Sequence, residues 1–197
     1  MNIFTKKVFD KKAQKRKSSL LFQKGLSLIE ASMVLALSAI VVSGVMYYYQ
    51  AASDNNKTQS TVSEVMSIIS AVNGLYVGTS GYTGLTEKVI MNTSAIPENY
   101  KDGNKIIHPF GGEINIKAAK GDAKYYIVLK DVPQGACVNL ASMNFGTSLA
   151  GAGVGSEAEQ AAQQGTATGK LQNKALTPAA AAQQCKPGNN SIAFLLK

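Results

Sequence analysis

The sequence has few of the side chains that catalytic and metal sites require, because His108 is its only histidine. A single imidazole leaves most general acid–base and zinc-binding arrangements without their bases or ligands. No serine stands with a histidine and an acid in a recognisable catalytic order. His108 precedes residues 109–112, which read PFGG and are typical of a turn, so we expect a structural role for it. We expect no catalytic residue, no metal site and no cofactor.

A second absence is that of charge, since none of the 23 residues from 31 to 53 carries one. About twenty apolar residues in a helix span the hydrocarbon core of a bilayer, so this stretch predicts a transmembrane helix. The alternative is an ordinary secretory signal peptide, which is removed just after its apolar stretch. The basic segment before it is longer than most signal-peptide n-regions, and no small-x-small site follows Tyr49. We therefore expect the helix to be retained.

Nearly all of the positive net charge of +8 lies at the N-terminus. Residues 1–24 hold eight basic side chains and one acid, whereas the rest of the chain holds 12 bases and 11 acids. A basic N-terminal arm can bind nucleic acid. Here it leads into a membrane segment, which favours a cytoplasmic anchor that follows the positive-inside bias. We expect no nucleic-acid partner.

Proline is absent from the first 96 residues. A helix is therefore predicted from near Leu26 to the glycines at 78, 81 and 84, about fifty residues on. Gly44 and Gly74 lower helix stability locally and leave a gentle break open. Beyond the membrane stretch, apolar side chains at helical spacing predict the stripe that faces a soluble domain: Val62, Val65, Met66, Ile69, Val72 and Tyr76. The opposite, polar side is predicted to hold Thr61, Ser63, Glu64, Ser67 and Asn73.

The fold class predicted is α+β, with the second half of this helix packed on an antiparallel sheet. Residues 78–104 read as a loop. Strands are expected at residues 105–107, 113–117, 125–132 and 192–196. Helical patterns follow at residues 134–143, 157–164 and 178–185. The glycine-rich residues 146–155 are expected to be irregular, and 151–155 lack the spacing and preceding strand of a nucleotide-binding loop, which predicts flexible surface there.

The two cysteines, Cys137 and Cys185, lie far downstream of the membrane segment. If the positive end stays inside, both lie on the outer, oxidising side, where a disulfide is the natural state. The alternative is two isolated thiols. A bond between them would bound a C-terminal region of the domain.

The junction at residues 24–30 reads KGLSLIE and leads directly into the apolar stretch. It resembles the signature of type IV prepilins: a basic leader that ends in glycine, then a hydrophobic residue, then glutamate five positions after the glycine. The resemblance implies cleavage between Gly25 and Leu26 by prepilin peptidase on the cytoplasmic face, and N-methylation of Leu26. It also implies a role in assembly for Glu30, since an acid beside a membrane helix is costly and functional by default. The alternative is a carboxylate that snorkels at the interface near the helix N-terminus.

Further resemblance covers most of the chain after Gly25. The 25-residue leader and Leu26, in place of phenylalanine, resemble the type IVb subclass. Four segments are similar to the bundle-forming pilins of enteric bacteria: residues 44–50, 73–76, 92–97 and 109–113. The two cysteines match the pair that bounds the C-terminal disulfide region of that family. The similarity is weakest at residues 146–174.

This resemblance implies the prepilin of a major type IVb pilus subunit. Its parts would be a cleaved leader at 1–25, a transmembrane and filament-core helix at 26–53, and a globular head at 54–197. Its partners would be further copies in a helical filament, prepilin peptidase, and an assembly machinery with a cytoplasmic ATPase. The precursor would lie in the inner membrane of a Gram-negative bacterium with its head in the periplasm, and the assembled pilus would be extracellular. Adherence, autoaggregation and microcolony formation would follow.

Two alternatives remain open on the sequence. A minor pilin or a type II secretion pseudopilin would share the leader and the long helix. A membrane-anchored binding module or enzyme would instead use residues 79–197 alone. That alternative needs a convergent polar site, and the sequence shows none.

Overall fold

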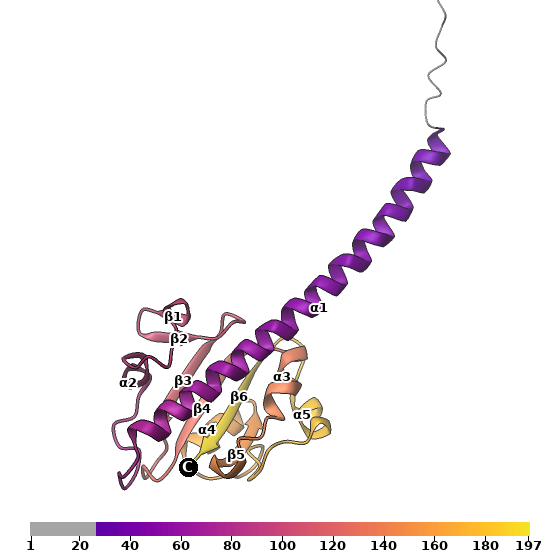
Figure 1. Ribbon diagram of the computed structural model, residues 1–197. Coiled ribbons are helices and arrows are strands. Elements are labelled where there is room, and N and C mark those ends of the chain that lie inside the picture. Colours follow the sequence, from indigo (N-terminus) through magenta and orange to yellow (C-terminus); the bar gives the residue numbers. More distant parts are fainter. Residues whose placement is uncertain (1–26) are drawn as a thin grey trace, which may run out of the picture. The chain divides into compact units, whose positions relative to one another are not determined.

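The computed structural model describes residues 27–197 (Figure 1), so the predicted cleavage site at Gly25 and Leu26 lies outside the described residues. The helices are α1 (Leu28–Leu75), α2 (Glu87–Met91), α3 (Gln134–Ala141), α4 (Ser156–Gln163) and α5 (Pro178–Gln184), with 3-10 turns η1 (Glu98–Tyr100) and η2 (Gly146–Ser148). The strands are β1 (Lys101–Asp102), β2 (Lys105–Ile107), β3 (Glu113–Ala118), β4 (Tyr125–Pro133), β5 (Leu149–Val154) and β6 (Asn189–Leu196).

The predicted long helix is confirmed as α1, which runs unbroken through 48 residues. Neither Gly44 nor Gly74 interrupts it. Gly78, at φ +80°, adopts the left-handed conformation that glycine favours just beyond a helix end. The chain divides within α1 into two units, which meet after Gly44.

The unit Val45–Lys197 is built on one antiparallel sheet of six strands in the order β1-β2-β3-β4-β6-β5. The four predicted strands are confirmed as β2, β3, β4 and β6. The C-terminal strand β6 inserts between β4 and β5, where Phe194 pairs with Ile127 on one side and Ala152 on the other. Because β6 is paired along both edges, the chain end is held inside the sheet, one strand in from the edge that β5 forms.

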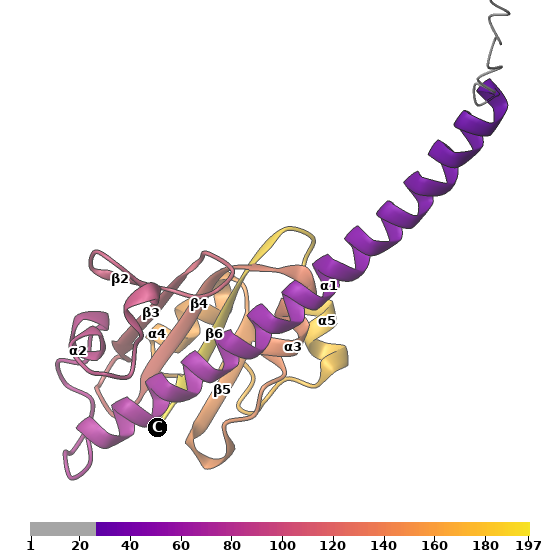
Figure 2. The ribbon, with the colours of Figure 1, turned by 45° about the horizontal axis from the view of Figure 1, so that its top comes forward.

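Helices cover both faces of this sheet. Alternate residues of β4 point to opposite sides, as strand geometry requires. Ile127 and Leu129 pack in the cluster that holds the second half of α1, whereas Tyr126 and Val128 pack against α4. Figure 1 and Figure 2 show the second half of α1 lying across one face, with α4 behind the strands. All five residues from Tyr125 to Leu129 are therefore buried.

The prediction of irregular chain at residues 146–155, with flexible surface at 151–155, is wrong, because most of this segment forms the strand β5, in which Gly151 and Gly153 are buried. Glycine and alanine have low strand propensity, so local preference did not indicate a strand. The reason lies in packing. A Cβ at Gly153 would press on the carbonyl oxygen of Lys170 and come within 2.7 Å of the Ala158 Cβ. Small residues are needed where another backbone and α4 approach the strand this closely.

The predicted loop at 78–104 contains three short elements, α2, η1 and β1. Of these, β1 adds an edge strand to the sheet beside β2. The segment also supplies Ile90, from α2, and Ile96, which precedes η1, to the core cluster that contacts α1. The helical patterns near 134–143, 157–164 and 178–185 are confirmed as α3, α4 and α5. Thr177 caps α5, since its hydroxyl accepts a hydrogen bond from the Ala180 N–H at 3.3 Å.

Candidate assembly site

Glu30 lies in the first turn of α1, and its side chain caps the N-terminus of that helix. Its Oε2 accepts a hydrogen bond from the backbone N–H of Ser27 at 3.0 Å. This contact is one half of a capping box, and it sets a carboxylate at the positive end of the helix dipole. The described residues thus give Glu30 a local capping contact. Its role in assembly stays a prediction, as do the cleavage after Gly25 and the methylation of Leu26.

The first half of α1 presents an uncovered apolar surface. Its large apolar side chains from Leu28 to Tyr49 are between 57% and 86% exposed. The helix is long and apolar enough to cross a membrane, with a mean hydropathy of 2.1 in its best window. Water does not favour an apolar surface of this size, so it needs lipid or other protein around it. Tyr47, Tyr48 and Tyr49 end this stretch, where either a membrane interface or neighbouring helices could receive them.

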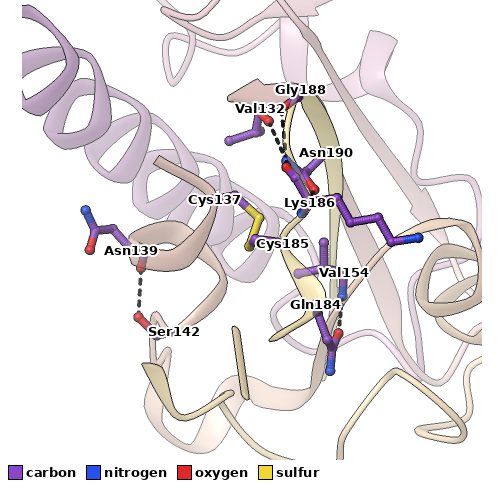
Figure 3. Close-up of a disulfide and its surroundings, with 10 residues drawn as sticks. All are labelled: Val132, Cys137, Asn139, Ser142, Val154, Gln184, Cys185, Lys186, Gly188 and Asn190. Carbon is purple, nitrogen blue, oxygen red and sulfur yellow. Dashed lines mark hydrogen bonds between the residues drawn. A yellow bond between two sulfur atoms is a disulfide. The ribbon is translucent and has the colours of Figure 1, made fainter. Parts of the chain in front are cut away.

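The expected disulfide between Cys137 and Cys185 is present (Figure 3). Cys137 belongs to α3, and Cys185 directly follows α5. The two cysteines are 48 positions apart, and their Cα atoms lie 6.0 Å from each other. The bond therefore closes a loop that contains β5 and α4, the part of the chain in which the family resemblance is weakest.

Asn190 helps to hold the end of the loop that the disulfide closes. This role was not predicted from the sequence. Its side-chain amide donates to the carbonyl oxygens of Lys186 at 2.9 Å and Gly188 at 3.1 Å, and to that of Val132 at 3.3 Å (Figure 3). Its Oδ1 accepts from the Lys186 N–H at 2.8 Å. One buried amide thus shapes the turn from Cys185 into β6. A lone asparagine at the start of a strand carries no sequence signal for such a role.

His108 has the structural role expected for it. The ring is buried, and its Nε2 lies 2.6 Å from the carbonyl oxygen of Lys130. The Phe110 N–H donates to Nδ1 at 3.2 Å, which makes Nδ1 the acceptor and Nε2–H the donor. Burial lowers the pKa of this imidazole. Within residues 27–197, no three histidine, cysteine or acidic side chains are placed to hold a metal ion.

The predicted polar side of α1 is partly wrong, because Thr61 and Glu64 are buried whereas Met66 is 52% exposed. The core-facing stripe is rotated by about one residue from the one the apolar pattern indicates. Neither carboxylate oxygen of Glu64 has a hydrogen-bond partner. Burial raises the pKa of this carboxyl to about 8. Sequence reasoning missed the position because an acid is normally assigned to the solvent side of a helix.

Three comparisons with known proteins bear on this arrangement. A sequence model of the family described as Bundlin matches residues 50–195. The chain is 47% identical to the major structural subunits of the bundle-forming pilus from Escherichia coli O127:H6 and from Escherichia coli O111:H-, over 89% of this chain and 95% of each relative. The crystal structure of TcpA, a type IV pilin from Vibrio cholerae El Tor biotype, is similar with a TM-score of 0.51 at 10% identity. That likeness covers 72% of this chain and 99% of the other and concerns the fold.

Proposed function

Since this chain belongs to the bundlin family and has the fold of a type IV pilin, we propose that it is the major structural subunit of a bundle-forming type IVb pilus. The observation that carries this is the 47% identity to major subunits over 95% of their length. The uncovered apolar half of α1 and the disulfide-closed head support it. Adherence, autoaggregation and microcolony formation are the functions that such a filament would serve.

In the filament, the apolar halves of α1 from many copies pack together, and the heads coat the outside. Each copy uses one surface to receive the next and a different surface to join the previous one. Such heterologous contacts do not close into a ring and give a helical polymer. Packing of this kind keeps the apolar side chains between Leu28 and Tyr49, which are exposed in the single subunit, away from water once α1 has left the membrane.

Before assembly, the prepilin lies in the inner membrane through residues 26–53, with its leader in the cytoplasm and its head in the periplasm. The concentration of basic residues before the apolar stretch supports this orientation. Prepilin peptidase removes residues 1–25, and Leu26 is then N-methylated. An assembly machinery driven by a cytoplasmic ATPase moves the mature subunit into the filament.

Cleavage creates a charged amine at Leu26, four residues before Glu30. Glu30 exchanges its capping contact with Ser27 for the Leu26 amine of a neighbouring copy as α1 enters the filament core. Two charges that leave water are each costly, and their attraction offsets this only when the geometry is good. The pair therefore sets the axial register of the subunits more than it adds stability.

The intact mass of the subunit in sheared surface filaments tests this proposal. We expect this chain to be the main component, with a mass that begins at Leu26 and includes one added methyl group. A subunit that retains residues 1–24, or one cut after Tyr49, would contradict it. A minor pilin or pseudopilin would be scarce in such filaments, so the abundance separates these alternatives from a major subunit.

A further inference from the structure

Three hollows adjoin one another along one side of the second half of α1. The first, of about 260 Å³, runs from Tyr49 to Ser60 beside Pro109. The second, of about 250 Å³, runs from Ser60 to Ser67, and the third, of about 470 Å³, from Ser67 to Leu75. Neighbouring hollows share Ser60 and Ser67. We call this continuous surface, from Tyr49 to Leu75, the α1 groove.

Small, exposed residues recur along the α1 groove every three or four positions: Ser60, Ser63, Ser67, Ser70 and Gly74. Their mean spacing is close to the 3.5-residue repeat with which one helix presents a seam to another element. Side chains of this size let a second backbone approach closely. This shape allows docking but does not by itself identify what docks.

Glu64 determines which kind of chemical group the α1 groove would bind. It lines the middle hollow, is only 4% exposed, and has no hydrogen-bond partner for either carboxylate oxygen. Buried acids in folded proteins are normally paired with a base or held by donors, because an unpartnered buried polar group is costly. In the single subunit Glu64 limits this cost by keeping its proton up to a pKa of about 8, and a cation from outside the subunit would instead stabilise its charged form.

The subunit's own cations near the groove are already engaged. Lys101, next to Tyr100 in the groove wall, pairs with Glu98 at 2.6 Å. Lys57 lies over the Phe110 ring, 5.9 Å from its centroid. Five exposed lysines, by contrast, have no ion pair or side-chain hydrogen bond with any residue in the described part of the chain: Lys88, Lys120, Lys174, Lys186 and Lys197. One copy therefore offers an acid without a base, together with bases that lack an acid.

We propose that the α1 groove receives a surface segment of a second copy of this chain, and that a lysine ammonium of that copy pairs with Glu64. The inference rests on the proposed function, because a filament holds copies in a fixed register. The occupant is argued from this charge complementarity. The carboxylate–ammonium pair forms only if the second copy is seated in one register, since poor geometry would leave two buried charges uncompensated.

Cross-linking in assembled filaments tests which occupant fills the groove. The full-length chain carries Ser63→Cys, and filaments grow from a mixture of ¹⁴N- and ¹⁵N-labelled subunits. A short maleimide–succinimide reagent is attached to the thiol introduced at position 63. We expect peptides that join position 63 of one isotope to one of the five lysines in the other isotope. Cross-links confined to one copy, or to a different protein, would overturn the proposal, and so would their complete absence from filaments of normal yield.

A charge-removing variant gives an independent readout. Glu64→Gln keeps the shape of the side chain, so we expect normal subunit levels and cleavage but at least a fivefold loss of filament yield. The matched control is Glu157→Gln, which removes the same charge from an exposed acid of α4 and is expected to leave filament yield unchanged. Wild-type yield from Glu64→Gln would refute the groove contact and leave the subunit function standing. A wild-type chain that forms no filaments would instead refute the proposed function.

Discussion

The imidazole of His108 and the backbone carbonyl of Lys130 are hydrogen-bonded at 2.6 Å, across 22 positions of sequence. This bond ties the turn between β2 and β3 to the middle of β4. The same ring accepts the Phe110 N–H through Nδ1, so both nitrogens are used only while the ring is neutral. Protonation would place a hydrogen on Nδ1 that faces the Phe110 N–H, and would break the hydrogen bond between them.

We expect the His108 contact to make the head less stable in mild acid. Burial lowers the folded-state pKa below the usual value of 6.5, although the Lys130 bond and Asp131 act the other way. The unfolded state therefore binds more protons between the folded pKa and 6.5, so stability is full above 6.5 and falls as the pH drops through this window. Urea unfolding of the chain in detergent should show a free energy of unfolding that falls as the pH drops through this window, and His108→Gln should lack this fall. Glu64 also titrates in this pH range, so the chains with and without His108→Gln are both compared with Glu64→Gln present. An equal dependence of stability on pH in the two chains would contradict the prediction.

Glu64→Gln should stabilise the unassembled subunit at neutral pH. The folded carboxyl keeps its proton up to a pKa of about 8, whereas the ordinary value is 4.5, so the unfolded state loses the proton first. Wild-type stability is therefore highest below 4.5 and falls as the pH rises towards 8. At pH 7 the variant should gain on the order of 3 kcal/mol, from about 1.4 kcal/mol per pH unit. Denaturant midpoints at pH 7 and pH 4.5 measure this, and a variant less stable than wild type at pH 7 would refute it.

Removing the disulfide should destabilise the head. Replacing Cys137 and Cys185 together by alanine frees a loop with a sequence separation of 48 residues. Chain-entropy reasoning gives a loss of about 4 kcal/mol for a loop of that length. Subunit levels in the periplasm should fall, and chemical unfolding should occur at lower denaturant. If both thiols of the wild-type chain were freely alkylated in native filaments, this bond would be absent and the prediction would fail.

Gly153→Ala should disrupt the contact between β5 and its neighbours. The new methyl group would press on the Lys170 carbonyl and on the Ala158 side chain, so the strand or α4 must move. A cost of roughly 1–3 kcal/mol is typical of such overpacking. Gly135→Ala is the matched control, because a Cβ there meets no atom within 4 Å and lies within α3. Thermal unfolding should show a lower Tm for Gly153→Ala and an unchanged or higher Tm for Gly135→Ala, and equal values would contradict the packing argument.

Glu30 should be needed for polymerisation and not for the subunit itself. Glu30→Gln removes the charge with little change of shape, and Glu30→Val makes the segment more apolar. Both variants should remain in the inner membrane and be cleaved after Gly25, yet give few or no filaments. Immunoblots of membranes and of sheared filaments separate the two steps. Wild-type filament yield from Glu30→Val would mean that Glu30 is a snorkelling interface residue.

The local sequence pattern was sufficient to predict those elements whose residues strongly favour a helix or a strand. The absence of proline and of charge predicts the first half of α1, and β-branched or aromatic residues predict β3, β4 and β6. The two cysteines and the exported context predict their disulfide. In each of these cases the short-range preference agrees with the final fold, so no distant contact is needed to identify the element.

Other features depended on contacts between distant segments. The strand β5 is made of residues with low strand propensity. It is held by pairing with β6, and α4 and the chain at 170–172 pack so closely on it that larger side chains would not fit. The buried side of α1 includes Thr61 and Glu64 because the way the helix lies on the sheet sets its rotation, which an apolar stripe indicates only to within about one residue. The sequence alone determined which segments become helix and strand, except for β5 and for the short elements α2, η1 and β1 in the segment read as a loop. Tertiary packing decided which acid is buried without a partner, because burial depends on neighbours that the chain supplies only once it is folded.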